Sequence, residues 1–446
     1  MKHPFLTDNP GAEPSVAARA VMVVAMFLAA VSTLVGGVAE REYATRRGAV
    51  EAALDSTSVV IFRAADMKMR SADTEYRYRQ ESNLLYLTGI DELGITFILT
   101  GRGVQLDGIT STRFLLAGAG VRKTIEAAGV LKDVVILDAG RLPEILALVL
   151  HGRQTLYLSM PDIPFVSDWL NNRPMFLDRD VRKELERRFA GLKVKSAAPV
   201  VARLREFKSP AEIGLISKSI AVTGDGMIRA MRASAPGVFE YELQAALEYE
   251  MTRQGAAYVG FPSIIGSGPN SLSLHYSVNR RQMRDGEIVV MDVGAEMEGY
   301  SADVTRSFPV NGLFSSEQRQ VYTAVLEAQK AAIAAVRPGV TFAELDAVAR
   351  ASLARSGFAK YLTHGISHHL GLDTHDVGSV DTIRAGMVIT VEPGAYIPAS
   401  DTTLGPAFRG WGIRIEDDVL VTVSGNVVLS SSIPKEIEEI ERIMRK

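Results

Sequence analysis

The chain has 446 residues, 47% of them hydrophobic and 23% charged, which is an ordinary composition for a soluble protein with more than one domain. With 49 Lys and Arg against 52 Asp and Glu, the net charge is −3, so electrostatics does not favour a nucleic-acid partner and none is expected. The absence of cysteine excludes disulfides, thiolate metal sites, iron–sulfur clusters and cysteine nucleophiles, and any metal must be held by His, Asp and Glu.

Residues 1–40 form an N-terminal extension in which 20–38 are uncharged and mostly apolar. Arg19 precedes this stretch, and the small residues at 37–39 suit a signal peptidase. Four explanations fit this stretch: a cleaved signal peptide, an uncleaved membrane anchor, a short buried helix, or a start codon placed too far upstream. Arginines on both sides leave the orientation of an anchor open. We expect an exported protein, periplasmic or extracellular, or one attached to a membrane through 20–38, with a cytoplasmic location as the alternative.

The next part of the chain, 41–205, alternates β-rich runs with helical stretches, which predicts an α/β N-terminal domain. Strands are expected at 58–62, 96–99 and 134–137, and a helix at 142–150. This part has no glycine motif for binding phosphate and no cluster of metal-ligating residues.

Longer helices characterise 206–446, which we interpret as a second domain. Ser209 followed by Pro210 and Glu212 is typical of a helix start, with a Ser cap, proline in the first turn and then an acid. Three further helices are expected, at 240–253, 317–336 and 342–355. Val- and Ile-rich strands with glycine turns lie between and after them, so the pattern favours an α+β domain with helices on a mostly antiparallel sheet.

The most informative stretch, 287–308, has two β-rich runs around a Glu-Gly turn at 298–299 and predicts a hairpin. Asp292 and Asp303 are eleven positions apart. An odd separation across an even-numbered turn places both carboxylates on one face, unless a bulge intervenes. Buried neighbouring carboxylates repel unless a cation or proton lies between them. Because Asp292 lies in an apolar run, we favour a pair of metal ligands over a pair of exposed acids.

Four of the seven histidines lie within twelve residues, at His364, His368, His369 and His375. A lone histidine is usually a satisfied core or surface side chain. A cluster among glycines is more typical of a site, as metal ligands or acid–base groups, although clustering does not identify the imidazole that binds.

Glu392 ends a β-rich run before Pro-Gly, and Glu416 lies in another run where Arg414 shares its face. Alone, each would be interpreted as a strand glutamate with a salt-bridge partner. With Asp292, Asp303 and the histidine cluster they make four carboxylates and an imidazole, a set that suits two divalent ions. Such ions lower the pKa of water and stabilise charge on an attacked carbonyl, so the residues predict a hydrolase.

Over about residues 45–446 the chain resembles the pita-bread metallopeptidases, specifically their aminopeptidase P branch. The matching segments are SGPNSLSLHYSVN (267–279), VMDVGAEMEGYSADVTRSFP (290–309), HGISHHLGLDTHDVG (364–378), VEPGAYI (391–397), GIRIEDDVLVT (412–422) and, for the N-terminal domain, residues 71–89. The resemblance implies an α/β N-terminal domain, an α+β pita-bread catalytic domain, and release of the first residue from peptides that have proline in second place.

The resemblance also implies a metal-binding set. Asp292 would bind the first metal ion, and Asp303 and Glu416 would bridge both ions. His368 and Glu392 would hold the second ion, and Glu392 would also exchange a proton with the attacking water. The expected ions are two Mn²⁺, with Co²⁺ and Zn²⁺ as alternatives.

Other side chains take catalytic roles by the same resemblance. His275 and His375 would polarise the scissile carbonyl, and His364 would line the pocket near the residue after the cut. Arg414 would hold the carboxylates together, because its planar fork matches a carboxylate. A homo-oligomer is also implied.

Two departures from the branch stand out. His369 occupies a position where the branch commonly has Trp, a change behind the site residues that is expected to alter substrate packing indirectly. Residues 114–132 lack the Arg-Asp and Trp-Asp-Gly elements usual in the branch, so contacts of the first domain with substrate are not implied.

Three alternatives remain open. A prolidase, which cleaves Xaa-Pro dipeptides, would need a closed pocket for the dipeptide carboxylate. A non-catalytic pita-bread binding protein and a metal-free hydrolase of the creatinase type are both disfavoured by the intact ligand set.

Overall fold

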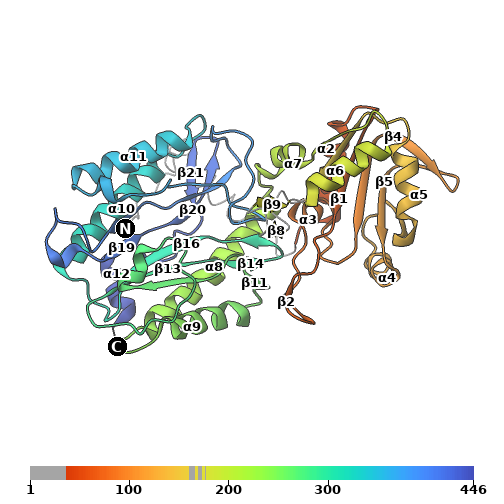
Figure 1. Cartoon of the computed structure of the whole chain (residues 1–446). Coiled ribbons are helices and arrows are strands. Elements are labelled where there is room, and N and C mark those ends of the chain that lie inside the picture. The colour runs from red at the N-terminus through yellow and green to blue at the C-terminus, as the bar shows by residue number, and fades with distance from the viewer. Residues whose placement is uncertain (1–36, 160–165, 169–172, 176, 446) are drawn as a thin grey trace, which may run out of the picture.

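The computed structural model describes residues 37–159, 166–168, 173–175 and 177–445, which form two domains side by side (Figure 1). The apolar stretch at 20–38 lies almost entirely outside the described residues. Within the described part of the chain, no helix combines the length and apolar character needed to cross a membrane.

A six-stranded mixed sheet forms the centre of the N-terminal domain. Its strands, in spatial order, are β10 (Lys193–Ser196), β7 (Thr155–Ser159), β1 (Ser58–Arg63), β4 (Thr96–Leu106), β5 (Ile109–Ala117) and β6 (Val135–Asp138). β1 is parallel to β7 and antiparallel to β4. The three expected strands are confirmed, but β4 continues to Leu106 and forms a long hairpin with β5 that the local pattern did not predict.

Both faces of this sheet are covered by helices. The helices are α2 (Glu40–Ala52), α3 (Ser82–Thr88), α4 (Ala119–Ala128), α5 (Leu142–Leu150), α6 (Leu177–Arg188) and α7 (Ala198–Arg205). Alternate residues of β1 face opposite sides, as the period of a strand requires. Val60 and Phe62 pack with the cluster that includes Val50 of α2, whereas Val59 and Ile61 pack with the cluster that includes Ile145 of α5. Two small strand pairs complete the domain, β2 (Met69–Ser71) with β3 (Thr74–Glu75) and β8 (Val166–Asp168) with β9 (Arg173–Met175).

The C-terminal domain begins where the sequence predicts a helix start. Ser209 and Glu212 form a reciprocal capping box at the start of α8 (Pro210–Ala233), with hydrogen bonds of 3.2 and 2.9 Å. Glu212 also pairs with Arg46 of α2 at 3.2 Å, so this helix start contacts the N-terminal domain. The other helices are α9 (Glu240–Arg253), α10 (Ser316–Ala335), α11 (Phe342–Arg355) and α12 (Ile437–Met444), which confirm the expected ones within a residue and add α12.

Short antiparallel sheets lie between the helices of this domain (Figure 1). Their strands are β11 (Tyr258–Val259), β12 (Ile264–Ser267), β13 (Ile288–Val293), β14 (Ala295–Met297), β15 (Tyr300–Ser301), β16 (Val304–Pro309), β17 (Val388–Val391), β18 (Gly394–Ile397), β19 (Trp411–Arg414), β20 (Asp417–Thr422) and β21 (Gly425–Val428). Short 3₁₀ turns in this domain are η2 (Gly268–Leu272), η3 (Ala359–Tyr361) and η4 (Pro406–Phe408), and η1 (Ala139–Arg141) lies in the N-terminal domain. Helix α8 packs on β14 and β15, and α10 packs on β17 to β19, which agrees with the predicted α+β class.

Candidate active site

The predicted hairpin places its two aspartates on one face. β13 and β16 pair with Asp292 opposite Thr305, and the same register continues through β14 and β15 without a bulge. The turn residues Glu298 and Gly299 both have positive φ, +50° and +86°, which suits a tight two-residue hairpin turn. Asp303 lies two residues before Thr305, so its side chain shares the face of Asp292, and both line one cavity.

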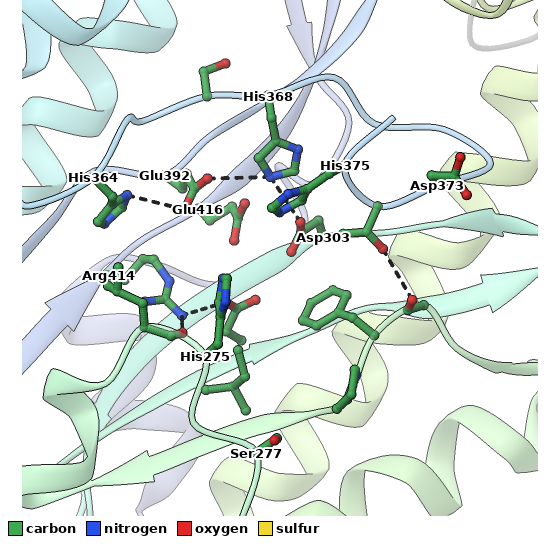
Figure 2. A pocket seen from close by; sticks show the side chains of 18 of the residues that line it. His275, Ser277, Asp303, His364, His368, Asp373, His375, Glu392, Arg414 and Glu416 are labelled. Carbon is green, nitrogen blue, oxygen red and sulfur yellow. Dashed lines mark hydrogen bonds and ion pairs between the residues drawn. The ribbon is translucent and has the colours of Figure 1, made fainter. Parts of the chain in front are cut away.

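His368 faces these aspartates from the loop before β17. Backbone hydrogen bonds join it to Thr390, whose amide donates to the His368 carbonyl at 2.9 Å. Its ring Nδ1 lies 3.0 Å from the carbonyl oxygen of His369, an acceptor, so Nδ1 carries the proton and Nε2 is free to bind a metal. Nε2 lies 3.4 Å from Asp303 Oδ2 and 3.5 Å from Glu392 Oε1 (Figure 2).

The two glutamates reach the same place from strand ends. Glu392 follows β17, and Glu416 lies between β19 and β20. The Glu416 amide donates to the carbonyl of Thr305 at 3.1 Å, and the Thr305 hydroxyl donates to Glu416 Oε2 at 2.7 Å. One ligand atom from each of Asp303, His368 and Glu416 lies within 4.8 Å of the others, a spacing compatible with a shared metal ion.

Crowding of buried acids perturbs the carboxylates strongly. Burial, and then the charge of Asp292, raises the pKa of Asp303 well above its usual value. Burial and neighbouring carboxylates also raise the pKa of Glu416 well above its usual value and that of Glu392 to about 8. Asp292 Oδ1 is buried and has no hydrogen-bond partner. A cluster with an orphaned carboxylate oxygen and this excess of negative charge has the donor set for divalent cations.

Arg414 holds the site from the side opposite the His368 ring (Figure 2). Its Nη2 pairs with Asp292 Oδ2 at 2.5 Å, and its Nη1 donates to the Tyr396 hydroxyl at 2.8 Å. That hydroxyl lies 3.0 Å from His364 Nε2, while His364 Nδ1 lies 2.8 Å from the carbonyl oxygen of Gly365. Because Nδ1 must donate to a carbonyl, Nε2 accepts from Tyr396, and a chain of hydrogen bonds runs from Arg414 through Tyr396 to His364.

All the side chains predicted from the sequence line one cavity of about 850 Å³ (Figure 2). They are His275, Asp292, Asp303, His364, His368, His375, Glu392, Arg414 and Glu416. The rings of His368 and His375 lie 4.2 Å apart. Burial lowers the pKa of both His364 and His375. The geometry brings the whole predicted set together, and the role of each member remains a prediction.

His369 does not belong to this group. Its ring packs edge-on against Phe342 of α11, with centroids 5.1 Å apart, and it does not line the cavity. Neither ring nitrogen has a hydrogen-bond partner. The side chain thus lies behind the cavity wall, where any effect on substrate packing would be indirect, as expected from the sequence, and that effect stays a prediction.

Three residues at the site were missed in the sequence. Tyr396 and Thr305 hold Arg414 and Glu416, and Arg79 of the N-terminal domain also lines the cavity. Arg79 pairs with Glu296 of the site hairpin at 2.9 Å. In the sequence, Arg79 was marked only by its position in 71–89, the segment that resembles the N-terminal domain of the aminopeptidase P branch.

Comparisons with known proteins identify relatives of both domains. Residues 214–423 match the model of metallopeptidase family M24, and residues 43–118 match that of the aminopeptidase P N-terminal domain. The Xaa-Pro aminopeptidase of Escherichia coli is 34% identical over 91% of this chain and 98% of its own length.

Solved structures agree over the same extent. Zn-substituted E. coli aminopeptidase P in complex with product has a TM-score of 0.79 at 33% identity, covering 92% of this chain and all of that one. A putative aminopeptidase P from Bacillus anthracis has a TM-score of 0.80 at 31% identity, covering 92% and 99%. With both domains matched and the predicted ligands in one cavity, the chain belongs to metallopeptidase family M24, in the branch with an aminopeptidase P N-terminal domain.

Proposed function

We propose that this protein is a two-metal Xaa-Pro aminopeptidase, which releases the first residue of peptides with proline in second place. The observation that carries the proposal is the convergence of four carboxylates and His368, with three further histidines, in one cavity. The likeness to Xaa-Pro aminopeptidases over nine-tenths of the chain supports the substrate class.

The metal ligands are assigned by donor chemistry and position. Asp292 would hold one ion, Asp303 and Glu416 would be shared, and His368 and Glu392 would hold the other. We propose Mn²⁺ as the ion, with Co²⁺ and Zn²⁺ as alternatives, because carboxylate oxygens dominate the set. Bound there, the cations would polarise the scissile carbonyl and lower the pKa of the attacking water.

The side chains around the ligands handle protons and developing charge. Glu392 would accept a proton from the attacking water and pass it to the leaving prolyl nitrogen. His275 and His375 would donate hydrogen bonds to the carbonyl oxygen as it becomes negative.

The Arg414–Tyr396–His364 chain has a different task. Arg414 fixes Asp292, and Tyr396 fixes the His364 ring, which lies at the cavity wall where the residue after the cut would bind. In this series of hydrogen bonds Arg414 donates to the Tyr396 hydroxyl, and the hydroxyl donates to His364 Nε2. The orientation of the His364 ring is therefore set before substrate arrives.

The proposal is tested by chelating the purified full-length protein, adding Mn²⁺ back, and assaying Ala-Pro-Ala cleavage. Activity should disappear on chelation and return with the metal. A protein that binds no Mn²⁺, or that cleaves no Xaa-Pro bond when loaded, would instead be a non-catalytic member of the family.

A prolidase is the second candidate, because the same metal centre would serve a dipeptidase. Whole-length likeness favours the longer-peptide enzyme. Comparing kcat/KM for Ala-Pro-Ala and Ala-Pro decides between the two, with Ala-Ala-Ala as the control for the proline requirement. Preference for the dipeptide would establish a prolidase.

The location of the enzyme is proposed from the sequence alone. We propose export or membrane attachment through 20–38, with a cytoplasmic enzyme as the alternative, and a homo-oligomer. Cell fractionation with N-terminal sequencing tests the first proposal, and light scattering on the purified protein tests the second. Soluble, uncleaved protein found only in the cytoplasm would reject export.

A further inference from the structure

A short irregular segment, 370–376, carries His375 into the cavity (Figure 2). It contains neither helix nor strand, so its conformation depends on contacts with its surroundings. Its own domain holds it through the Leu370 amide, which donates to the Val388 carbonyl at 3.0 Å, the Ser301 amide, which donates to the Gly371 carbonyl at 3.0 Å, and the Thr374 hydroxyl, which donates to the Gly260 carbonyl at 3.4 Å. Its two acids, Asp373 and Asp376, are bound by side chains of the N-terminal domain and of the region that connects the domains.

The N-terminal domain contacts the 370–376 segment through Arg79, Ser82 and Arg205. Ser82 of α3 donates from Oγ to Asp373 Oδ1 at 2.7 Å, and Arg79 donates to the carbonyl oxygen of Leu372. Arg79 also pairs with Glu296, so one side chain joins the segment to the site hairpin. The segment is thus held between the two domains.

Arg205, the last residue of α7, makes a buried contact with the segment. Its side chain is 2% exposed, and Nη1 donates to Asn83 Oδ1 of α3 at 2.8 Å. Nη2 donates to Asp373 Oδ2 at 2.7 Å and also to Asp376 Oδ1. Lys208 Nζ donates to the other oxygen of Asp376 at 3.0 Å. Both carboxylate oxygens of Asp376, itself 2% exposed, are therefore bound by cations from the region that connects the domains.

Asp376 is the neighbour of His375 in the chain, and its backbone is tied to the metal-binding region. Its amide donates at 2.9 Å to the carbonyl oxygen of His369, the same atom that accepts from Nδ1 of His368. Although burial alone would raise it, Lys208 and Arg205 hold the pKa of Asp376 below its usual value. The carboxylate is ionised, and it depends on these two cations.

We infer that Arg205 is a positioning residue for the proposed reaction, fixing His375 in the cavity through its contact with Asp376. Through Asn83 the same guanidinium makes the N-terminal domain part of the catalytic apparatus. The inference rests on the proposed function. Without Arg205, Asp376 retains one cation and Asp373 loses a donor, so the 370–376 segment relaxes. A displacement of about 1 Å in a catalytic group costs on the order of 10²-fold in rate.

The first test replaces Arg205 in the full-length, Mn²⁺-loaded enzyme. Arg205→Met removes every donor but keeps a long apolar side chain, and kcat on Ala-Pro-Ala should fall by roughly 10- to 100-fold. KM and bound Mn²⁺ should change little. Arg205→Lys keeps a charge beside Asp376 and should restore part of the lost rate. Arg153→Met is the matched control, because Arg153 is also buried but donates to backbone carbonyls within the N-terminal domain, and its kcat should be unchanged.

A double-mutant cycle with His375→Ala separates positioning from general destabilisation. If Arg205 acts through His375, then Arg205→Met causes no further loss of kcat in the His375→Ala background. An equal loss in both backgrounds would overturn the inference, and so would an unchanged kcat in either single variant or a rate loss matched by Mn²⁺ loss. Should Arg205→Met fail to fold, Asp376→Asn replaces it with the same expected result.

Different results would refute the positioning role of Arg205 and the proposed function. Wild-type enzyme that cleaves Ala-Pro-Ala alongside a fully active Arg205→Met variant refutes the positioning role alone. Loaded wild-type enzyme that cleaves no Xaa-Pro peptide refutes the proposed function and the positioning role together.

Discussion

Raising the pH of the chelated protein from 6.5 to 8 should lower its free energy of unfolding. In the folded, metal-free state the pKa of Glu392 is raised to about 8, whereas the group has a value of 4.5 when unperturbed. Between these values the folded protein holds a proton that the unfolded chain has released. Stability falls with pH wherever the folded state binds more protons. The stabilising contribution of protonated Glu392 is therefore complete below pH 4.5 and is lost as the pH rises to 8.

The magnitude follows from the width of the window. One pH unit per bound proton corresponds to about 1.4 kcal/mol, so 1.5 units give at most about 2 kcal/mol for Glu392 alone, and less near pH 8, where the group is half ionised. Asp303 and Glu416, whose pKa values are also raised, act in the same direction. The pH range starts at 6.5 to avoid an opposing effect of His364 and His375. Folding lowers the pKa of both histidines from 6.5, so below pH 6.5 these residues make the stability rise with pH.

Denaturant unfolding at four pH values between 6.5 and 8 measures this effect. The chelated protein should lose stability across the series, while protein saturated with Mn²⁺ should not, because the metal keeps its ligands ionised in the folded state. Glu392→Gln should reduce the slope by about one proton. A chelated protein that is equally or more stable at pH 8 would refute the assignment of these buried acids as an uncompensated cluster.

Three substitutions test the roles of individual side chains. Asp303→Ala should abolish turnover without unfolding the protein, and retained turnover with a normal melting curve would be incompatible with a two-metal site. His375→Ala should lower kcat by roughly 10²-fold, the usual cost of losing a positioned donor, whereas an unchanged rate would place it outside the reaction. Arg414→Met leaves Asp292 without its buried partner, so denaturant unfolding of the metal-free protein should show a loss of about 3–5 kcal/mol. A loss below about 1 kcal/mol would mean that Arg414 contributes little to stability.

Local patterns predicted the parts of the site that depend on local rules. The two-residue period of a strand and an even-numbered turn predicted that Asp292 and Asp303 lie on the same face of the hairpin, and the observed strand register confirms this. The start of α8 followed from the Ser cap, the proline in the first turn and the acid at Ser209, Pro210 and Glu212, a pattern that needs only four consecutive residues, and the structure shows a capping box there. Both rules operate within one element or one hairpin, so no knowledge of the tertiary fold was required.

The contacts that hold the site residues in place join segments far apart in the sequence, so no local sequence pattern predicted them. Thr305 donates to Glu416, 111 positions away, and Arg205 reaches Asp376 across 171 positions. A threonine in a strand or an arginine at a helix end is compatible with many surroundings, because exposed and buried positions both accept these residues. Only the packing of the two domains makes Arg205 a buried cation with two acidic partners.

Three consecutive acids at the beginning of β20, Glu416, Asp417 and Asp418, show how structure separates a functional carboxylate from a structural one. Asp417 points away from the cavity, and although burial alone would raise its pKa, Arg306 and Lys435 hold it below the usual value. Glu416 and Asp418 point the other way, and burial with the charge of Asp303 raises the pKa of each. Alternation along a strand turns Asp417 toward the core, whereas Glu416 lines the cavity and Asp418 accepts a hydrogen bond from the Asp303 amide at 3.1 Å. A buried carboxylate supplied with protein cations stabilises the fold, whereas one left without them favours an external cation. On this criterion Glu416, which lines the cavity just before β20, is a carboxylate that favours a bound cation.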